Sequence, residues 1–148
     1  MNYVLDTGAF LSLAQSMYFE EILKQKKIFS TKEVVEELEN IAQYEDLLGK
    51  AAQEVLKKKK YIQIETPKRF LDLKIEAAEH SVFSLAKEKN YFVITDDIHA
   101  ARIAKEKEHL NSAPSFYLLF LLCKEKKRTK KEIQQDIERI VYKRNWLS

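Results

Sequence analysis

Three acidic residues closely follow short apolar segments in this chain of 148 residues. Asp6 comes after the run from Tyr3 to Leu5, and Asp96 and Asp97 come just after the run from Tyr91 to Ile94. Short apolar runs of this kind are typical of buried strands, and open α/β sheets bind their ligands beyond the carboxyl ends of the strands. We therefore expect Asp6, Asp96 and Asp97 to share one edge of a sheet.

Thr95 lies beside the acidic pair, where its hydroxyl group could hold a metal-bound water, orient a carboxylate or cap the turn into the next helix. Asp97 is also placed to be the N-cap of the helix expected from Ile98 onwards. We place Asp96 ahead of Asp97 as a functional carboxylate and keep both as candidates.

Two glutamates lie on or near the inward side of predicted helices. At about 100° per residue, Glu79 falls about 60° from Val82, within the apolar stripe of its helix. Glu37 falls about 60° from Val34, at the rim of another stripe, whereas Glu36 points to solvent. A lone carboxylate in an apolar stripe loses hydration at a cost of several kcal/mol. Glu79 must therefore be protonated, bound to a cation, paired with Lys or Arg, or used as a helix cap.

Several carboxylates at one edge of a sheet cannot all stay ionised without compensation, and a hard divalent cation would supply it. Ligand sets made only of oxygen favour Mg²⁺ or Mn²⁺, which lower the pKa of bound water and neutralise charge on a phosphate. The single cysteine, Cys123, excludes a Cys-based zinc site, and the sequence has no Walker loop, GxGxxG motif or Ser-His-Asp set. The pattern favours metal-assisted hydrolysis of a phosphodiester.

Alternating strands and helices must position these residues. The predicted strands are Tyr3–Leu5, Lys27–Phe29, Tyr61–Glu65 and Tyr91–Ile94, with a short edge strand at His109-Leu110. Helices are predicted over about 9–25, from Ser30 with a capping box to Glu33, over about 44–59, 77–89, 98–107 and 115–126, and from Thr129 with a capping box to Glu132. This alternation predicts an α/β fold, with a central parallel sheet between helical layers.

The composition indicates one compact domain over residues 1–148, with a helical C-terminal part at about 124–148. Hydrophobic residues make up 45% of the chain, and Gly and Pro number 2 each, so linkers are absent from the pattern. The longest apolar run, Phe116 to Cys123, is far too short to span a bilayer, and we expect no signal peptide and a cytoplasmic location. The same run is apolar enough to be buried between helices or to form a subunit interface.

Four segments together resemble the motifs of the PIN-domain family. Val4-Leu5-Asp6-Thr7-Gly8-Ala9-Phe10-Leu11 is similar to the family's opening motif, and Ser30 through Leu38, with Glu37 before Leu38, is similar to the second. Glu79 followed by Leu85-Ala86, and Val93-Ile94-Thr95-Asp96-Asp97 followed by Ala100-Ala101-Arg102, resemble the third and fourth. The resemblance covers nearly the whole chain.

The resemblance implies a parallel sheet of strand order 3-2-1-4-5 and cleavage of single-stranded RNA with Mg²⁺ or Mn²⁺. It implies Asp6, Glu37, Glu79 and Asp96 as the acidic set, with Asp97 as an alternative or additional ligand. Many compact members are VapC-type toxins that pair with an antitoxin, and many form homodimers. Glu79 departs from the Asp often found at the third position, and the segment from Lys124 to Ser148 is longer than in the smallest toxins.

Basic residues are the candidates for RNA contact. Arg102 lies one turn beyond the acidic pair and could bind a substrate phosphate or pair with a carboxylate of the cluster. Lys57 to Lys60 and the segment from Lys124 to Lys131 could bind phosphates, although lysines at helix ends are more often solvated and complement the helix dipole.

Two other functions compete with the metal-dependent ribonuclease. One is a catalytically inactive PIN scaffold that binds RNA or a protein partner, against which the intact acidic set argues. The other is an unrelated α/β module such as a phosphoacceptor receiver domain. That fold requires an acidic pair after the first strand, whereas here the pair follows the penultimate one.

Overall fold

Five short parallel strands form the centre of the molecule. The computed structural model describes residues 1–144, and its strands are β1 (Asn2–Leu5), β2 (Lys27–Ser30), β3 (Ile62–Ile64), β4 (Phe92–Ile94) and β5 (Ser112–Ala113). They are ordered β3-β2-β1-β4-β5, and every neighbouring pair is parallel. Both the parallel sheet and the strand order 3-2-1-4-5 are confirmed.

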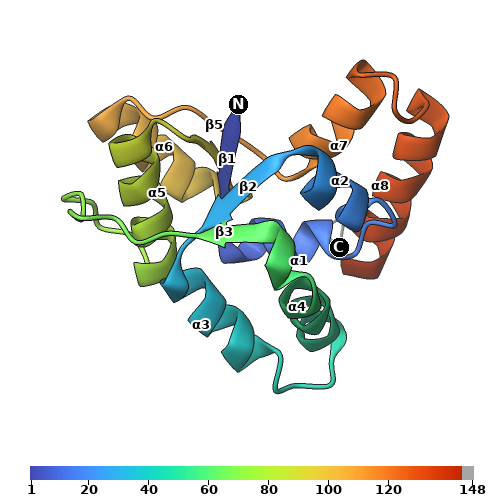
Figure 1. Ribbon diagram of the computed structural model, residues 1–148, viewed down its shortest axis with the longest axis horizontal. Coiled ribbons are helices and arrows are strands. Elements are labelled where there is room, and N and C mark those ends of the chain that lie inside the picture. Colours follow the sequence, from blue (N-terminus) through green and yellow to red (C-terminus); the bar gives the residue numbers. More distant parts are fainter. Residues whose placement is uncertain (145–148) are drawn as a thin grey trace.

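Helices flank this sheet in an α/β/α arrangement. They are α1 (Thr7–Leu13), α2 (Phe19–Gln25), α3 (Lys32–Ile41), α4 (Leu47–Lys57), the 3-10 helix η1 (Lys59–Tyr61), α5 (Ala77–Lys89), α6 (Ile98–Glu108), α7 (Phe116–Lys124) and α8 (Lys130–Arg144). Figure 1 shows α5 and α6 on one side and α2, α7 and α8 on the other, and α5 contacts β1 and β4 while α2 contacts β2 and α7. No helix within residues 1–144 is both long and apolar enough to cross a membrane.

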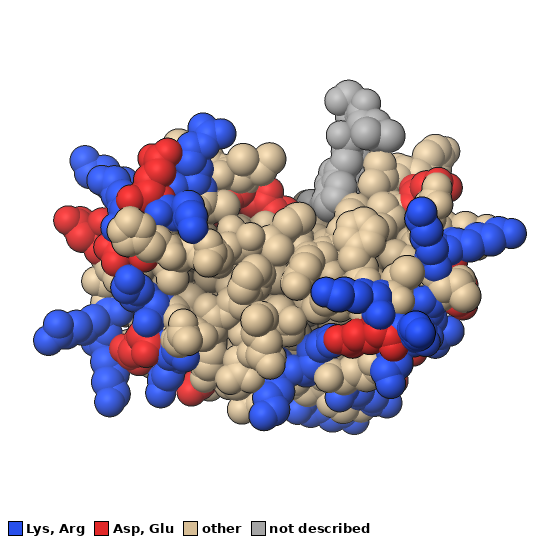
Figure 2. Space-filling view, turned by 90° about the horizontal axis from the view of Figure 1, so that it is seen from above, with Lys and Arg blue, Asp and Glu red and all other residues tan. Residues whose placement is uncertain are grey.

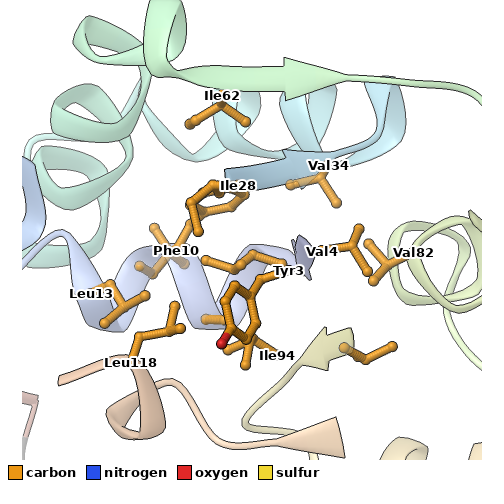
Figure 3. Packing of buried hydrophobic residues seen from close by; sticks show 14 of the residues in the cluster. Tyr3, Val4, Phe10, Leu13, Ile28, Val34, Ile62, Val82, Ile94 and Leu118 are labelled. Carbon is orange, nitrogen blue, oxygen red and sulfur yellow. The ribbon is translucent and has the colours of Figure 1, made fainter. Parts of the chain in front are cut away.

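The core is built by strand residues that alternate between the two helical layers. Val4 is completely buried and points toward Val82 of α5, whereas its neighbour Tyr3 points to the side of Leu118 on α7 (Figure 3). Successive side chains of a strand point to opposite faces, so a sheet covered on both faces buries all of them. This packing fixes the ends of β1 and β4, where the acidic residues lie.

One long helix was predicted over about 9–25, and this prediction is wrong because the structure has α1 and α2 with a turn between them. The buried Asp136 of α8 holds the turn. Its carboxylate accepts hydrogen bonds from Ser16 Oγ (2.5 Å) and the backbone N–H of Met17 (3.2 Å). A long-range contact therefore interrupts a segment whose local pattern is helical throughout.

The N-cap predicted for the helix after β2 is displaced by one residue. Ser30 is the last residue of β2 and donates a hydrogen bond to the carbonyl of Leu5 (2.8 Å), whereas the Thr31 hydroxyl accepts from Val34 N–H (3.3 Å) and is the N-cap of α3. The Ser30–Glu33 capping box is consequently absent.

The capping box predicted at Thr129 and Glu132 is confirmed. The backbone N–H of Thr129 donates to Glu132 Oε1 (2.9 Å), and the N–H of Glu132 donates to Thr129 Oγ1 (3.1 Å). The helix that follows is described as far as Arg144, so residues 145–148 of the predicted C-terminal extension lie outside the described residues.

The edge strand lies at Ser112–Ala113 and not at the predicted His109-Leu110. His109 adopts a left-handed conformation (φ 58°) as the C-cap of α6, and Leu110 N–H donates to Ala104 O (3.3 Å). His109 and Leu110 therefore complete the end of the helix, and the strand begins after it.

Candidate active site

Asp6 is the most deeply buried carboxylate at the edge where the strands end. It follows β1 as the N-cap of α1, with Oδ1 accepting from Ala9 N–H (2.9 Å), and only 3% of the residue is exposed. The register of β1 with β4 pairs Leu5 with Ile94, which brings Asp6 beside Thr95. The Thr95 hydroxyl donates a hydrogen bond to Asp6 Oδ2. Of the roles predicted for Thr95, the structure contains two: its hydroxyl orients a carboxylate, and it caps the turn into α6 by accepting a hydrogen bond from the N–H of Asp97.

The environment of Asp6 disfavours its charged form. Burial, which has the largest effect, and the negative charges of Asp96 and Asp97 together raise the pKa of Asp6 to about 6, although the hydrogen bonds from Thr95 and Ala9 act in the opposite direction. Within the described part of the chain Asp6 has no ion pair with Lys or Arg. Its charge is therefore only partly compensated by the protein.

Asp96 is held by two serines that the sequence analysis did not single out. Its carboxylate accepts hydrogen bonds from Ser12 Oγ (3.0 Å) on α1, and from Ser115 N–H (2.7 Å) and Oγ (2.8 Å) at the start of α7. Both serines are buried among apolar residues. Their positions, on the helix after β1 and just after β5, were the available signal.

Asp97 has the capping role that was one of its two predicted functions. Its Oδ1 accepts from Ala100 N–H (2.9 Å) at the start of α6, and its own N–H donates to Thr95 Oγ1 (3.1 Å). Thr95 therefore contacts both Asp6 and Asp97. The Asp97 side chain is exposed, so it faces the surface that a substrate would approach.

Glu79 lies in the first turn of α5, where it is half-buried. Burial, a hydrogen bond with Asp97 and the charges of Asp97, Asp6 and Glu76 together raise the pKa of Glu79 to about 8, and burial has the largest effect. From its place in the apolar stripe, Glu79 was predicted to be protonated, bound to a cation, paired with Lys or Arg, or used as a helix cap. The N-cap of α5 is Glu76, and no Lys or Arg pairs with Glu79 among the described residues, so protonation and cation binding remain.

Asp96 and Asp97 open into different hollows. A hollow of about 480 Å³ is lined by Glu76, Glu79 and Asp97, together with Lys74 and His99. A second hollow of about 400 Å³ is lined by Thr95 and Asp96. Asp97 is thus the member of the pair that shares a hollow with Glu79, and Glu76, which was not predicted, lies there as well.

Glu37 and Arg102 make no hydrogen bond or ion pair with this group in the described residues. Glu37 is half-buried on α3 and makes no hydrogen bond or ion pair with the described residues. Arg102 is exposed on α6 and forms no ion pair in residues 1–144, so the predicted alternative of a bridge to the acidic cluster is not found there. Both side chains are free to contact a ligand.

The carboxylates do not form a closed ligand cage. Among the described residues no three His, Cys, Asp or Glu side chains are grouped so that they could hold a metal ion. The structure brings Asp6, Thr95, Asp97 and Glu79 into one linked group. Asp96 lies close enough to this group for its negative charge to raise the pKa of Asp6. Their oxygen chemistry fits a hard cation, but their positions would have to adjust to bind one.

Comparisons with known proteins agree with this fold. The chain resembles a PilT N-terminus domain protein from the hyperthermophilic archaeon Sulfolobus solfataricus P2 (19% identity, 82% of this chain and 92% of that chain, TM-score 0.50). It also resembles PAE2754 from Pyrobaculum aerophilum (15%, 84% and 90%, TM-score 0.63). A third similar structure is VapBC2 from Rickettsia felis bound to a DNA fragment from their promoter (17%, 77% and 98%, TM-score 0.54).

At these identities the likeness is one of fold, and no curated protein matches the chain. The family assignment comes from a match to the sequence model of a protein family. The model of DUF3368, described as a PIN domain, matches residues 2–148. The chain therefore belongs to the PIN-domain family.

Proposed function

We propose that this PIN-domain protein is a metal-dependent endoribonuclease that hydrolyses single-stranded RNA with Mg²⁺ or Mn²⁺. The observation that carries the proposal is the grouping of Asp6, Asp97 and Glu79 where β1 and β4 end: Thr95 links Asp6 to Asp97, and Asp97 lines one hollow with Glu79. In this environment the pKa is raised to about 6 for Asp6 and to about 8 for Glu79. Two acids held in this state, with neither Lys nor Arg as a partner in the described part of the chain, favour a cation as the missing counter-charge.

The residues that would hold the cation are Asp6, Glu79, Asp96 and Asp97. All four offer carboxylate oxygens, the donor that Mg²⁺ and Mn²⁺ prefer. When bound, the cation would supply an activated water and neutralise charge that develops on the scissile phosphate.

The other candidates act around these ligands. Thr95 orients Asp6 through its hydroxyl group, and such support of a ligand is typically needed for full activity. Glu37 would add a further carboxylate from α3, and the exposed Arg102 would bind a phosphate of the RNA.

The experiment is cleavage of a labelled single-stranded RNA of mixed sequence in Mn²⁺ or Mg²⁺. We expect EDTA to abolish cleavage, and Asp6→Asn and Glu79→Gln each to lower its rate by more than about 100-fold, since removing a ligand costs more than removing a supporting residue. Glu37→Gln is compared with Glu36→Gln, its exposed neighbour, which should leave the rate unchanged. A folded wild-type protein that cleaves no single-stranded RNA would contradict the proposal.

An inactive scaffold that binds RNA or a protein partner is the second candidate, and the absence of a closed ligand cage in residues 1–144 favours it. Such a protein would bind RNA in EDTA and tolerate Asp6→Asn. The cleavage assay with matched variants separates the two functions.

We further propose that this protein is a VapC-type toxin. It would pair with an antitoxin protein, form a homodimer and act in the cytoplasm. The similarity in fold to VapBC2 from Rickettsia felis supports the toxin, and the single Cys123 fits a reducing compartment. The proposal that residues 1–148 form one domain is supported by the match of the family model to residues 2–148. Co-purification of a small DNA-binding protein expressed from the neighbouring gene would test the pairing.

A further inference from the structure

Two lysine-rich segments that are far apart in the sequence lie near each other at the amino-terminal ends of the strands. Lys27 is the first residue of β2, and the register of β2 with β3 (Ile28 with Ile62) places it beside η1, Lys59–Tyr61. Its neighbour Lys26 forms an ion pair with Glu125, the residue that ends α7 (Nζ to Oε2, 2.5 Å). The start of β2 thus joins the Lys59–Lys60 segment to the turn between α7 and α8.

A second set of contacts fixes this turn against α2. Arg128 forms an ion pair with Glu21 of α2 (2.7 Å), and its guanidinium group lies 4.7 Å from the centre of the Tyr18 ring. These two contacts hold the backbone of the turn beside α2, so the lysines on either side of Arg128 extend from a fixed position.

The resulting surface, which we call the basic strip, consists of Lys27, Lys59, Lys60, Lys126, Lys127 and Lys130. All six are exposed, and none lies within 4.0 Å of a carboxylate in the described residues. Lys126, Lys127 and Lys130 line a hollow of about 310 Å³. Figure 2, viewed from the side on which β1 begins, shows Lys and Arg side chains gathered along the lower right of the molecule.

The basic strip is separate from the candidate active site. The acidic residues follow the last residues of β1 and β4, whereas the strip surrounds the first residues of β2 and β3. A strand of four residues spans about 13 Å, so the two surfaces lie at opposite ends of the strands. A ligand of the strip therefore does not need to enter the acidic hollows.

The composition of the strip distinguishes between polyanions and protein partners. Protein interfaces depend on a few large apolar or aromatic anchors. The exposed Phe120 lines a hollow with Lys130 at one end of the strip, whereas the hollow lined by Lys126, Lys127 and Lys130 contains no large apolar side chain from the described residues. Phosphate backbones require only mobile cations, and they bind lysines without sequence preference. The solvated helix-end role that the sequence favoured for each segment alone does not explain why both converge.

We infer that the basic strip binds the phosphate backbone of single-stranded RNA outside the active site. The inference rests on RNA as the ligand, as in the proposed function, but it does not require cleavage. The strip would hold a long RNA by segments remote from the scissile bond, which adds affinity and leaves the choice of cleavage site to the active site.

The test measures binding of a fluorescein-labelled single-stranded RNA of about 20 nucleotides by anisotropy in EDTA. The strip variant carries Lys59→Gln, Lys60→Gln, Lys126→Gln and Lys127→Gln. The control carries Lys50→Gln, Lys68→Gln, Lys89→Gln and Lys107→Gln, which are exposed lysines outside the strip and give the same change in charge. We expect the strip variant to weaken binding at least about tenfold, with a salt slope smaller by about 0.7 for each lost contact, and the control to bind as the wild type does.

Three results would overturn the inference: equal losses in the strip variant and the control, no binding by the wild type at low salt, or tighter binding of an acidic peptide than of RNA. Thermal melts of both variants verify folding. Because cleavage is not measured, an inactive protein can still confirm the strip, and an active nuclease can still fail this test.

Discussion

Asp6 and Thr95 show how one backbone register creates an active-site contact. The pairing of Leu5 with Ile94 sets the two residues side by side, and the Thr95 hydroxyl then donates to the buried carboxylate of Asp6. This hydrogen bond lowers the pKa of Asp6 against the stronger effect of burial. Thr95 is therefore a positioning residue for the most buried acid of the site.

Replacing Thr95 by Val removes this donor at nearly constant volume. We expect the pKa of Asp6 to rise above about 6, the free energy of unfolding to fall by about 1–3 kcal/mol, and RNA cleavage to fall about 10- to 100-fold. Urea unfolding and the cleavage assay measure the two effects. Thr95→Ser keeps the hydroxyl group and should restore activity, whereas equal activity of the Val and Ser variants would rule out the positioning role.

Glu79 predicts a pH dependence of stability in the metal-free protein. Its pKa is about 8 in the folded state and about 4.5 when the group is unperturbed, so the folded state holds the proton more tightly. The contribution of protonated Glu79 to the free energy of unfolding is complete below pH 4.5 and is lost as pH rises through 8. Glu79→Gln keeps a neutral side chain at every pH. We therefore expect the melting temperature of this variant in EDTA, relative to that of the wild type, to rise between pH 5 and pH 9. Parallel pH profiles of the two proteins would contradict the raised pKa.

At the scale of elements, the C-terminal helix determines the shape of the segment that follows the first acid. Asp136 of α8 is 2% exposed and binds Ser16 and Met17, and it also pairs with Arg139, which donates to the carbonyl of Gln15. The turn between α1 and α2 is therefore held by a helix that lies more than a hundred residues later in the chain. This contact thereby supports α1, the helix that Asp6 caps.

Asp136→Ala should consequently destabilise the protein by roughly 2–3 kcal/mol, because it leaves buried donors without a partner. Urea unfolding measures the loss. Glu138→Ala removes an exposed carboxylate from the same helix and should change stability by less than about 0.5 kcal/mol. Equal effects of the two variants would mean that Asp136 does not clamp the turn.

Most elements could be predicted because their patterns are local. The apolar run before Asp96 and the periodicity around Val82 predicted β4 and α5 closely. The single helix over 9–25 failed because its interruption depends on Asp136, and the N-cap shifted from Ser30 to Thr31 because the Ser30 hydroxyl bonds to β1. Contacts between distant segments left no local signal.

The candidate site was predictable to a similar extent. Strand ends and helix faces selected Asp6, Asp97 and Glu79, which the structure links through Thr95 and through a hydrogen bond. The serines that hold Asp96 were missed because a buried serine has no distinctive spacing, and Glu76 was missed because only the loop before α5 places it near Glu79.

At the scale of the whole molecule, two differently charged groups lie at opposite ends of the strands. The uncompensated acids lie where the strands end, and the unpaired lysines of the basic strip lie where they begin. The formal net charge of +3 does not reveal this arrangement, because it is a sum over the whole chain. Charge that is divided in this way suits a protein that binds a cation on one surface and a polyanion on the other.

The proposed homodimer is a prediction at this scale. Sedimentation equilibrium at high protein concentration should give twice the mass of one chain, and the result should persist in about 0.5 M salt, which screens attraction between the acidic and basic surfaces. A monomer at every concentration would exclude the dimer without bearing on the acidic site.

Binding of Mn²⁺ tests the central claim, that these acids form a cation site, most directly. The loss of the free Mn²⁺ signal in electron paramagnetic resonance is measured at pH 8 for the wild type, Asp6→Asn and Glu79→Gln, with Glu36→Gln as the control. The account predicts saturable binding by the wild type and the control that is weakened more than about 100-fold in the other two. Binding that is unaffected by either substitution, or no binding at millimolar Mn²⁺, would contradict it.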